Sequence, residues 1–99
     1  MVIRLKDHIN RCVTGDEGDT IAKLIKDAFR NNETVNVSFE SFTVASSSFV
    51  NSAFIALLDD YSMDYIRSKL EFSHSNRAIN DLIKRRFTFE AERLSPKAS

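Results

Sequence analysis

The stretch VNVSFESFTVASSSFVNSAFIALL, residues 35–58, changes its apolar periodicity once, and this change indicates the fold class. Residues 35–39 alternate apolar and polar side chains, which is the period-two pattern of a half-buried β-strand. From residue 50 to residue 58 the apolar side chains recur at intervals of three and four residues, which predicts an amphipathic helix. That helix is expected to begin at the serine triplet, residues 46–48.

The same two patterns continue on both sides of this stretch. The apolar spacing of residues 19–32 predicts a helix with Asp19 as its N-cap and a stop at Asn31 or Asn32. Residues 70–73 alternate again and predict a second strand, after which Ser75 or Asn76 can cap a third helix.

The ends of the chain are more ambiguous in their patterns. Two short apolar runs, residues 2–5 and 9–13, suit two further strands that could form a hairpin. Residues 87–91 alternate once more, which fits either a short terminal strand or the end of the third helix. Residues 1–94 are therefore expected to form one domain, with residues 95–99 as a flexible C-terminal tail.

Strands that alternate with helices favour right-handed, largely parallel connections and a sheet with helices packed on it. Each predicted helix has one apolar face, so all of them can pack on a single face of the sheet. We expect an α/β fold with a four- to five-stranded mixed sheet and about three helices on one face. The other face would be partly polar and available to a partner.

The composition argues against two functional classes, nucleic-acid-binding and membrane proteins. Ninety-nine residues, 42% hydrophobic and 28% charged, fit one small globular domain. Fourteen basic and fourteen acidic residues cancel, which argues against nucleic-acid binding despite the basic run at residues 84–86. The apolar runs fall short of the roughly 18 residues of a membrane-spanning helix, and the N-terminus lacks a signal-peptide pattern. A soluble, cytoplasmic domain without membrane contact is expected.

The residue types that carry chemistry do not form a recognisable set. Two His and one Cys occur without the spacing of a metal site, so no metal or cofactor is expected. Cys12 lies in a predicted strand, where a lone cysteine is more often a small buried hydrophobe than a thiolate. Gly15 and Gly18 are flanked by acidic residues that would repel a phosphate. Because no acid–base pair or activated nucleophile can be named, we expect no enzymatic activity.

The serine triplet is the feature that rises above this background. A helix N-terminus presents unpaired N–H groups and a partial positive charge, so it stabilises a nearby anion. Three interpretations fit: simple helix capping, phosphorylation that adds roughly 1.5 to 2 negative charges, or the binding of a nucleotide or other small anion. The spacing of the serines does not choose among them.

Two stretches, VNVSFESFTVASSSFVNSAFIALL and KLEFSHSNRAINDLIKRR, resemble the STAS-like domains of unknown function, small bacterial proteins akin to anti-sigma-factor antagonists. The resemblance covers roughly residues 9–89 and is sharpest over residues 35–58. There SFESFTVASSSF is similar to the family's DF-x-x-V-x-x-x-S-SF stretch, and Ala53 and Phe54 to the "aF" of the following helix. Phe49 stands where the relatives carry a small glycine, and it either anchors the helix in the core or reshapes the docking surface.

The resemblance implies a regulatory, non-enzymatic role through protein contacts. In the anti-sigma antagonists a serine at the start of the second helix is phosphorylated by a histidine-kinase-like ATPase, which also binds that surface. Ser47 falls on this position with Ser48 beside it. The implied partner surface comprises Ser46, Ser47, Ser48, Asn51 and Ser52. The alternative is a small-ligand sensor that uses the same helix N-terminus, and the eight Phe residues could also support a homodimer.

Overall fold

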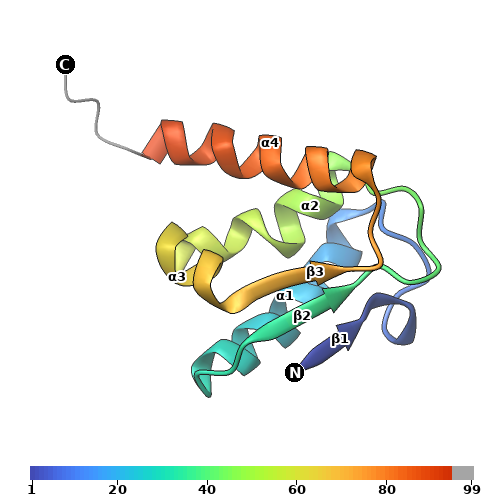
Figure 1. Cartoon of the computed structure of the whole chain (residues 1–99), viewed down its shortest axis with the longest axis horizontal. Helices are drawn as coiled ribbons and strands as arrows, with labels where there is room; N and C mark the ends of the chain where they lie inside the picture. Colours follow the sequence, from blue (N-terminus) through green and yellow to red (C-terminus); the bar gives the residue numbers. More distant parts are fainter. Residues whose placement is uncertain (95–99) are drawn as a thin grey trace.

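The computed structural model describes residues 1–94, which form a three-stranded parallel sheet and its helices (Figure 1). The sheet order is β1-β2-β3, so β2 is central and is paired on both sides. Ile3 of β1 and Phe72 of β3 both lie opposite Val37 of β2. The strands are β1 (Val2–Arg4), β2 (Val35–Ser38) and β3 (Leu70–Ser73).

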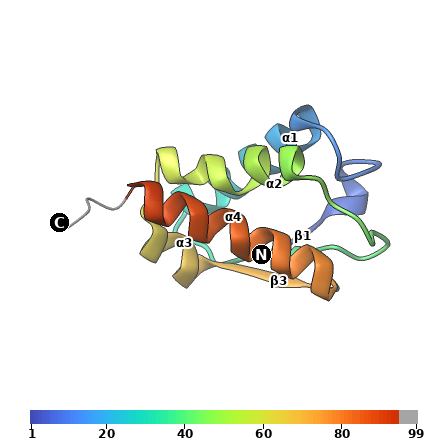
Figure 2. The same ribbon diagram turned by 90° about the horizontal axis from the view of Figure 1, so that it is seen from above.

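Four α-helices and two short 3-10 helices complete the described chain. Helices α1 and α2 lie on the same side of the sheet, behind it in Figure 1 and away from β3 in the view from above (Figure 2). Helix α4 packs mainly on α2 and η2 rather than against β3. The helices are α1 (Gly15–Arg30), α2 (Ser47–Ala53), α3 (Met63–Lys69) and α4 (Arg77–Leu94), with η1 (Leu5–Asp7) and η2 (Ile55–Asp59).

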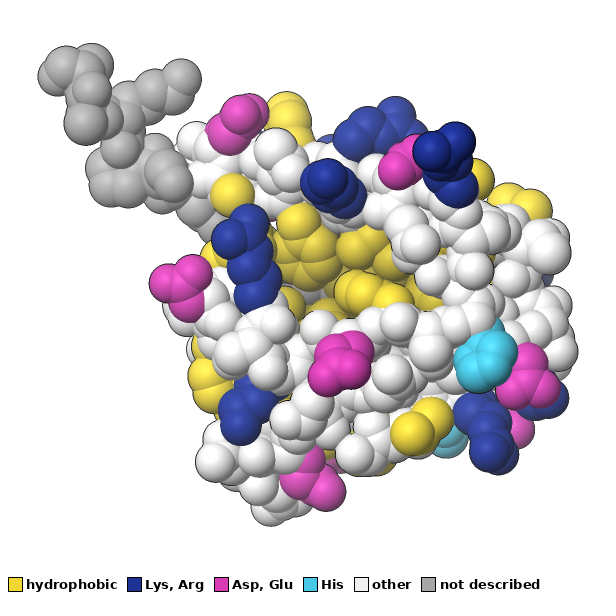
Figure 3. All heavy atoms as spheres, in the orientation of Figure 1, with side chains coloured by type: hydrophobic (Ala, Val, Ile, Leu, Met, Phe, Trp, Pro, Cys, Tyr) yellow, Lys and Arg dark blue, Asp and Glu magenta, His cyan; other side chains and the backbone are white. Residues whose placement is uncertain are grey.

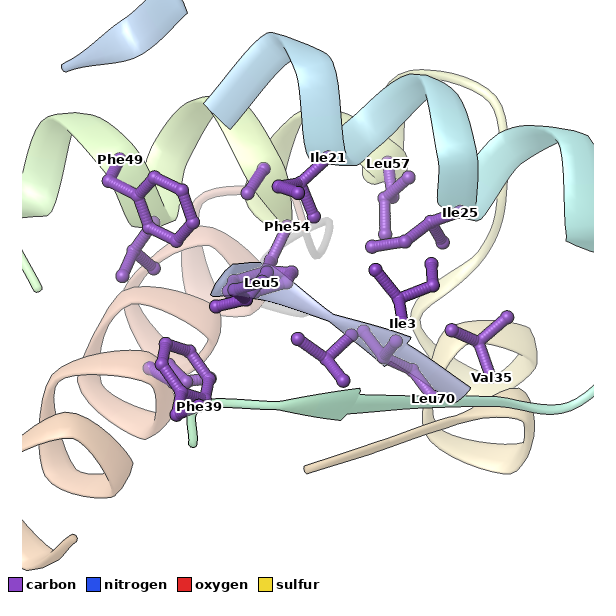
Figure 4. Close-up of a cluster of buried hydrophobic side chains, with 14 of the residues drawn as sticks. Ile3, Leu5, Ile21, Ile25, Val35, Phe39, Phe49, Phe54, Leu57 and Leu70 are labelled. Atoms are coloured by element: carbon purple, nitrogen blue, oxygen red, sulfur yellow. The ribbon is translucent and has the colours of Figure 1, made fainter. Parts of the chain in front are cut away.

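The two faces of the sheet differ in the way that the strand alternation predicts. Ile3 and Val35 point toward the helices that cover the sheet (Figure 4), and Ile3, Val35 and Val37 are at most 1% exposed. Their neighbours on the opposite face include Val2, 62% exposed, and the exposed Glu71. The side chains of a strand alternate between faces, so helices cover one face and leave the other open.

The number of strands differs from the prediction of four or five in a mixed sheet, because residues 9–13 form no strand. Ile9 and Cys12 are both buried, three residues apart rather than two, so the segment does not have the geometry of a strand. The carbonyl of Cys12 instead accepts a hydrogen bond from the N–H of Ser46, 2.9 Å away. The segment is therefore held by the start of α2 and not by a neighbouring strand. Residues 87–91 continue α4.

The helices also differ from the prediction, since residues 1–94 form four α-helices rather than about three. α1 begins at Gly15, and its N-cap is Thr14 rather than Asp19, because Thr14 and Glu17 form a capping box. The predicted helix from the serine triplet onward is broken after Ala53 and continues as η2. α3 was not predicted: Ser62 caps it by accepting a hydrogen bond from the Tyr65 N–H at 3.1 Å. The predicted tail lies outside the described residues.

Close contact between α1 and α2 positions the start of α2. A Cβ atom on Gly18 would come within 2.6 Å of the Ser52 Cβ and 2.7 Å of the Phe49 carbonyl oxygen. No side chain fits there, so glycine lets the two helix backbones approach. Phe49 of α2 and Phe54, the C-cap of that helix, are fully buried, and their rings lie edge to face with centroids 6.0 Å apart.

Candidate functional site

The serine triplet begins α2, and its three members have different surroundings. Ser46 is the N-cap: its Oγ accepts a hydrogen bond from the Phe49 N–H at 3.1 Å and donates one to the Val13 carbonyl. Its N–H donates to the Cys12 carbonyl. Ser46 therefore joins the loop before α1 to the start of α2, and its hydroxyl is engaged in hydrogen bonds to Val13 and Phe49.

Ser47 and Ser48 are the first two residues of α2, and both are exposed. Within residues 1–94 neither hydroxyl is hydrogen-bonded to another protein group. No acidic residue lies in the first turn of α2. Two unengaged hydroxyls thus lie at the partially positive end of a helix.

Asn51 and Ser52, the other residues of the predicted partner surface, are half-buried and engaged in packing. The Asn51 Oδ1 accepts a hydrogen bond from the Arg86 Nε at 2.8 Å, which links α2 to α4. Ser52 faces α1, where its side chain lies against Gly15 and Gly18. The structure therefore brings Ser47 and Ser48 together at the surface and uses Asn51 and Ser52 to hold α2 in place.

Phe49 resolves one alternative left open by the sequence. Its side chain is 0% exposed and belongs to the main hydrophobic cluster (Figure 4). It therefore anchors the first turn of α2 in the core rather than reshaping the surface. Anchoring at Phe49 turns Ser47 and Ser48 outward, because residues one and two positions away on a helix do not share its face.

A second polar cluster lies at the carboxyl ends of β2 and β3 and was not predicted. The Ser38 Oγ lies 3.3 Å from the His74 Nδ1 and accepts a hydrogen bond from the Glu40 N–H, also at 3.3 Å. The Glu40 carboxylate pairs with the Lys6 Nζ at 2.8 Å, and this contact lowers the pKa of Glu40. The carboxyl ends of neighbouring parallel strands lie at the same edge of a sheet. From the two predicted strands, the sequence could therefore have placed Ser38, at the end of β2, near His74, which follows β3.

Ser38 and His74 superficially resemble a nucleophile and its base, but Ser38 is only 3% exposed. Its hydroxyl oxygen also accepts the Glu40 N–H, which fixes the turn after β2. Both turns use left-handed backbone at residues other than glycine, with φ of 75° at Ser41 and 53° at His74. The cluster therefore holds the two strand exits together.

Cys12 is 1% exposed, as expected of a small buried hydrophobe. Burial, with a smaller contribution from the charge of Glu17, raises the pKa of the Cys12 thiol to about 12. The thiol is therefore neutral at physiological pH and is not a nucleophile. Among residues 1–94, no three His, Cys, Asp or Glu side chains gather as a metal-binding group. In the same range, no helix has both the length and the apolar character needed to cross a membrane.

Residues 17–80 match the model of a protein family described as a STAS-like domain of unknown function. The matched region begins in α1, contains β2, α2, α3 and β3, and ends at the start of α4. It includes the whole serine triplet and the strand before it. No curated protein and no solved structure matches the chain.

Proposed function

Because this chain belongs to the family of STAS-like domains of unknown function, we propose that it is a non-enzymatic regulatory module that binds a histidine-kinase-like ATPase. The partner docks at the start of α2, and phosphorylation of Ser47 switches the contact. The observation that carries this proposal is the different hydrogen bonding and exposure of the three serines. Ser46 is occupied as the N-cap, whereas the hydroxyls of Ser47 and Ser48 are exposed.

Phosphorylation at Ser47 is compatible with the local structure. A phosphate adds roughly 1.5 to 2 negative charges, and at a helix N-terminus this charge is stabilised by the helix dipole. The first turn of α2 contains no acidic residue that would repel it. Modification would therefore change the charge of the surface and leave α2 folded. A partner that binds the uncharged surface would lose affinity.

The alternative function, small-ligand sensing at the same place, has less support. α2 is only seven residues long, and the Ser46 side chain already accepts the Phe49 N–H. Few donors therefore remain for a separate anion. A protein contact needs only the exposed hydroxyls and the surface around them.

A phosphorylation assay tests the switch. The chain is incubated with ATP and histidine-kinase-like ATPases encoded next to its gene, and the modified residue is located by mass spectrometry. We expect one phosphate on Ser47, which Ser47→Ala removes. Ser68→Ala is the matched control, since Ser68 is an exposed serine on α3 and the change should leave phosphorylation intact. Phosphate on Ser48 alone would contradict the assignment of Ser47.

A binding measurement tests the partner independently of the modification. Titration calorimetry compares wild type, Ser47→Asp and Ser68→Asp for affinity to the same ATPase. A desolvated negative charge at the contact should weaken binding by about tenfold, equivalent to about 1.4 kcal/mol, and only for Ser47→Asp. Equal affinity of all three proteins would remove the switch, and no binding by wild type would remove the partner.

A further inference from the structure

An open apolar groove lies between β3 and α4, on the side of the molecule away from α1. Its volume is about 350 Å³. Apolar side chains from three elements line it, namely Ile66 of α3, Leu70 and Phe72 of β3, and Phe87 of α4. Figure 3 shows it as a hollow with a hydrophobic floor, and lysine and arginine side chains lie at its border. We call this feature the β3–α4 groove.

The groove runs beside an unpaired strand edge. β3 pairs only with β2, so its other side has no strand partner within residues 1–94. The Ser73 carbonyl faces β2, since it accepts a hydrogen bond from the Phe39 N–H at 2.9 Å. Successive residues of a strand direct their N–H and C=O groups to opposite sides, so those of Phe72 point away from β2, toward the groove. A free edge of this kind is a template for another strand.

Helix α4 does not fill this space, because it is held elsewhere. It packs mainly on α2 and η2, and the hydrogen bond from the Arg86 Nε to the Asn51 Oδ1 fixes its middle on α2. An added strand lies about 4.8 Å from its neighbour, within the region that the groove leaves open beside β3. Alternate side chains of that strand would point to the Leu70 and Phe72 side of the sheet.

The positive charges at the border of the β3–α4 groove favour an acidic occupant. Arg67 of α3 and Lys84 of α4 both line the groove, and both are exposed. Within the described part of the chain neither forms a salt bridge, although the exposed Lys6 and the half-buried Lys26 do. Glu71, the acidic residue of β3, lies on the opposite face of the sheet. The groove therefore combines an apolar floor with two unpaired positive charges.

We propose that the β3–α4 groove binds an extended segment of another protein, which adds to β3 as a fourth strand. Its alternate apolar side chains enter the groove, and its acidic side chains pair with Arg67 and Lys84. Main-chain hydrogen bonds to β3 provide part of the affinity, and the groove provides the sequence preference. This surface is separate from the start of α2 and does not depend on Ser47.

Charge also separates this occupant from a second copy of the chain. Pairing of two β3 edges would bring two copies of Arg67 and Lys84 to one interface without acidic partners. Like charges brought together at an interface cost several kcal/mol, so an acidic segment is favoured over self-association.

Selection from a displayed library of random peptides of about ten residues, a length sufficient for one strand, tests the proposal. We expect the enriched peptides to alternate apolar residues and to carry Asp or Glu near their ends. An enriched peptide should shift the backbone amide resonances of Leu70 and Phe72 and leave those of Val2 and Arg4, on the other sheet edge, unchanged. Failure to enrich any peptide, or shifts confined to β1, would overturn the proposal.

Two modifications then separate strand addition from other ways of filling the groove. N-methylation of the peptide amides that face β3 should abolish binding, because it removes the main-chain donors of the added strand. The side chains stay intact, so the loss would not come from the apolar or acidic contacts. The double variant Arg67→Glu/Lys84→Glu should weaken binding of an acidic peptide at least tenfold. Added salt should weaken binding to wild type but strengthen binding to the variant, because it screens an attraction in the first and a repulsion in the second. Lys23→Glu, a charge reversal at an exposed position on α1, should change affinity less than twofold.

Three other outcomes would overturn parts of this proposal. Undiminished binding of every N-methylated peptide would show a helical or irregular occupant and overturn strand addition. Equal affinity of the double variant and wild type would overturn the role of the two cations. Light scattering of the chain alone tests self-association: a dimer whose formation shifts the amide resonances of Leu70 and Phe72 would assign the groove to a second copy and overturn the proposal.

Discussion

The α1–α2 contact and the β3–α4 groove are two junctions around one core, and they are packed in opposite ways. At the first, Gly18 allows the backbones so close that an added Cβ would lie 2.6 Å from a neighbouring atom. At the second, about 350 Å³ remains open between a strand edge and a helix. The closed junction fixes the start of α2, and the open one leaves β3 accessible.

The difference in packing between the two junctions identifies the surfaces of this small domain that are available for contacts. Residues that hold the closed junction, such as Ser46 and Ser52, have their polar groups occupied or facing another helix. Residues at the open junction, such as Arg67 and Lys84, have no such engagement among the residues described. Substitutions should therefore affect stability at the first junction and binding at the second.

Gly18→Ala should have the largest effect, because it breaks the closed junction. The new methyl group would meet the backbone of α2 at Phe49 and Ala53, which cannot move as a flexible side chain can. We expect a loss of about 3 kcal/mol in the free energy of unfolding, measured by urea denaturation. Gly15→Ala is the control, since its Cβ would meet only the Ser52 Oγ at 3.1 Å, and it should change stability by less than about 1 kcal/mol. Equal losses would contradict the close-contact argument.

Asn51→Ala should have the next largest effect, because it removes the link from α2 to α4. The Arg86 guanidinium loses the acceptor at 2.8 Å, and we expect a cost of about 1 kcal/mol by urea denaturation. Asn10→Ala, at an exposed position, is the matched control and should be neutral. A double-mutant cycle with Arg86→Met isolates the pair, and zero coupling energy would show that the hydrogen bond does not hold α4.

Glu17 gives the start of α1 a pH dependence. Hydrogen bonds from the Thr14 and Val13 N–H groups lower the pKa of this carboxyl in the folded chain. Its stabilising contribution is therefore complete above the unfolded pKa, about 4.3, and is lost as the pH falls through the lower folded pKa. Glu17→Gln keeps the capping geometry without the charge, so its urea midpoint should decline less than that of wild type on acidification.

Glu33→Gln is the control for that pH experiment. Glu33 is exposed, and its carboxylate has no hydrogen-bond partner within residues 1–94. The variant should follow the wild-type pH profile. A Glu17→Gln profile identical to wild type would show that the capping box does not contribute the expected acid sensitivity.

Arg67→Gln and Lys84→Gln should have the smallest effects on folding. Both side chains border the open groove and are exposed, so each change should alter the free energy of unfolding by less than about 0.5 kcal/mol. Thermal and urea denaturation of the two variants check this. A loss above about 1.5 kcal/mol would mean that the groove border is part of the stabilising structure, and the contrast between the two junctions would fail.

Much of the architecture was predictable where one local pattern dominates. The alternation of residues 35–39 and 70–73 located β2 and β3, and the stop at Asn31 matches the C-cap of α1. The expected strand at residues 9–13 was wrong because a short apolar run can be buried without pairing in a sheet. α3 was missed because Ile66 is its one buried residue, so the helix shows no apolar periodicity.

The candidate site was predictable in part for the same reason. The serine triplet is visible as a cluster, but the sequence treats its members alike. Which hydroxyl is occupied depends on Val13, a residue distant in the chain. The pairing of Ser38 with His74 likewise depends on adjacent strand ends and has no local signature.

Side-chain periodicity within a few residues was enough to predict the α/β class, the strands at residues 35–39 and 70–73, the helix that begins at the serine triplet, and the single apolar face of each predicted helix. Three features required the folded structure: the three-stranded sheet of residues 1–94 with β2 at its centre, the engagement of Ser46 while Ser47 and Ser48 are exposed, and the groove beside β3. These features depend on contacts between residues far apart in the chain. Such contacts are set by how the helices and strands pack together, which local periodicity does not encode.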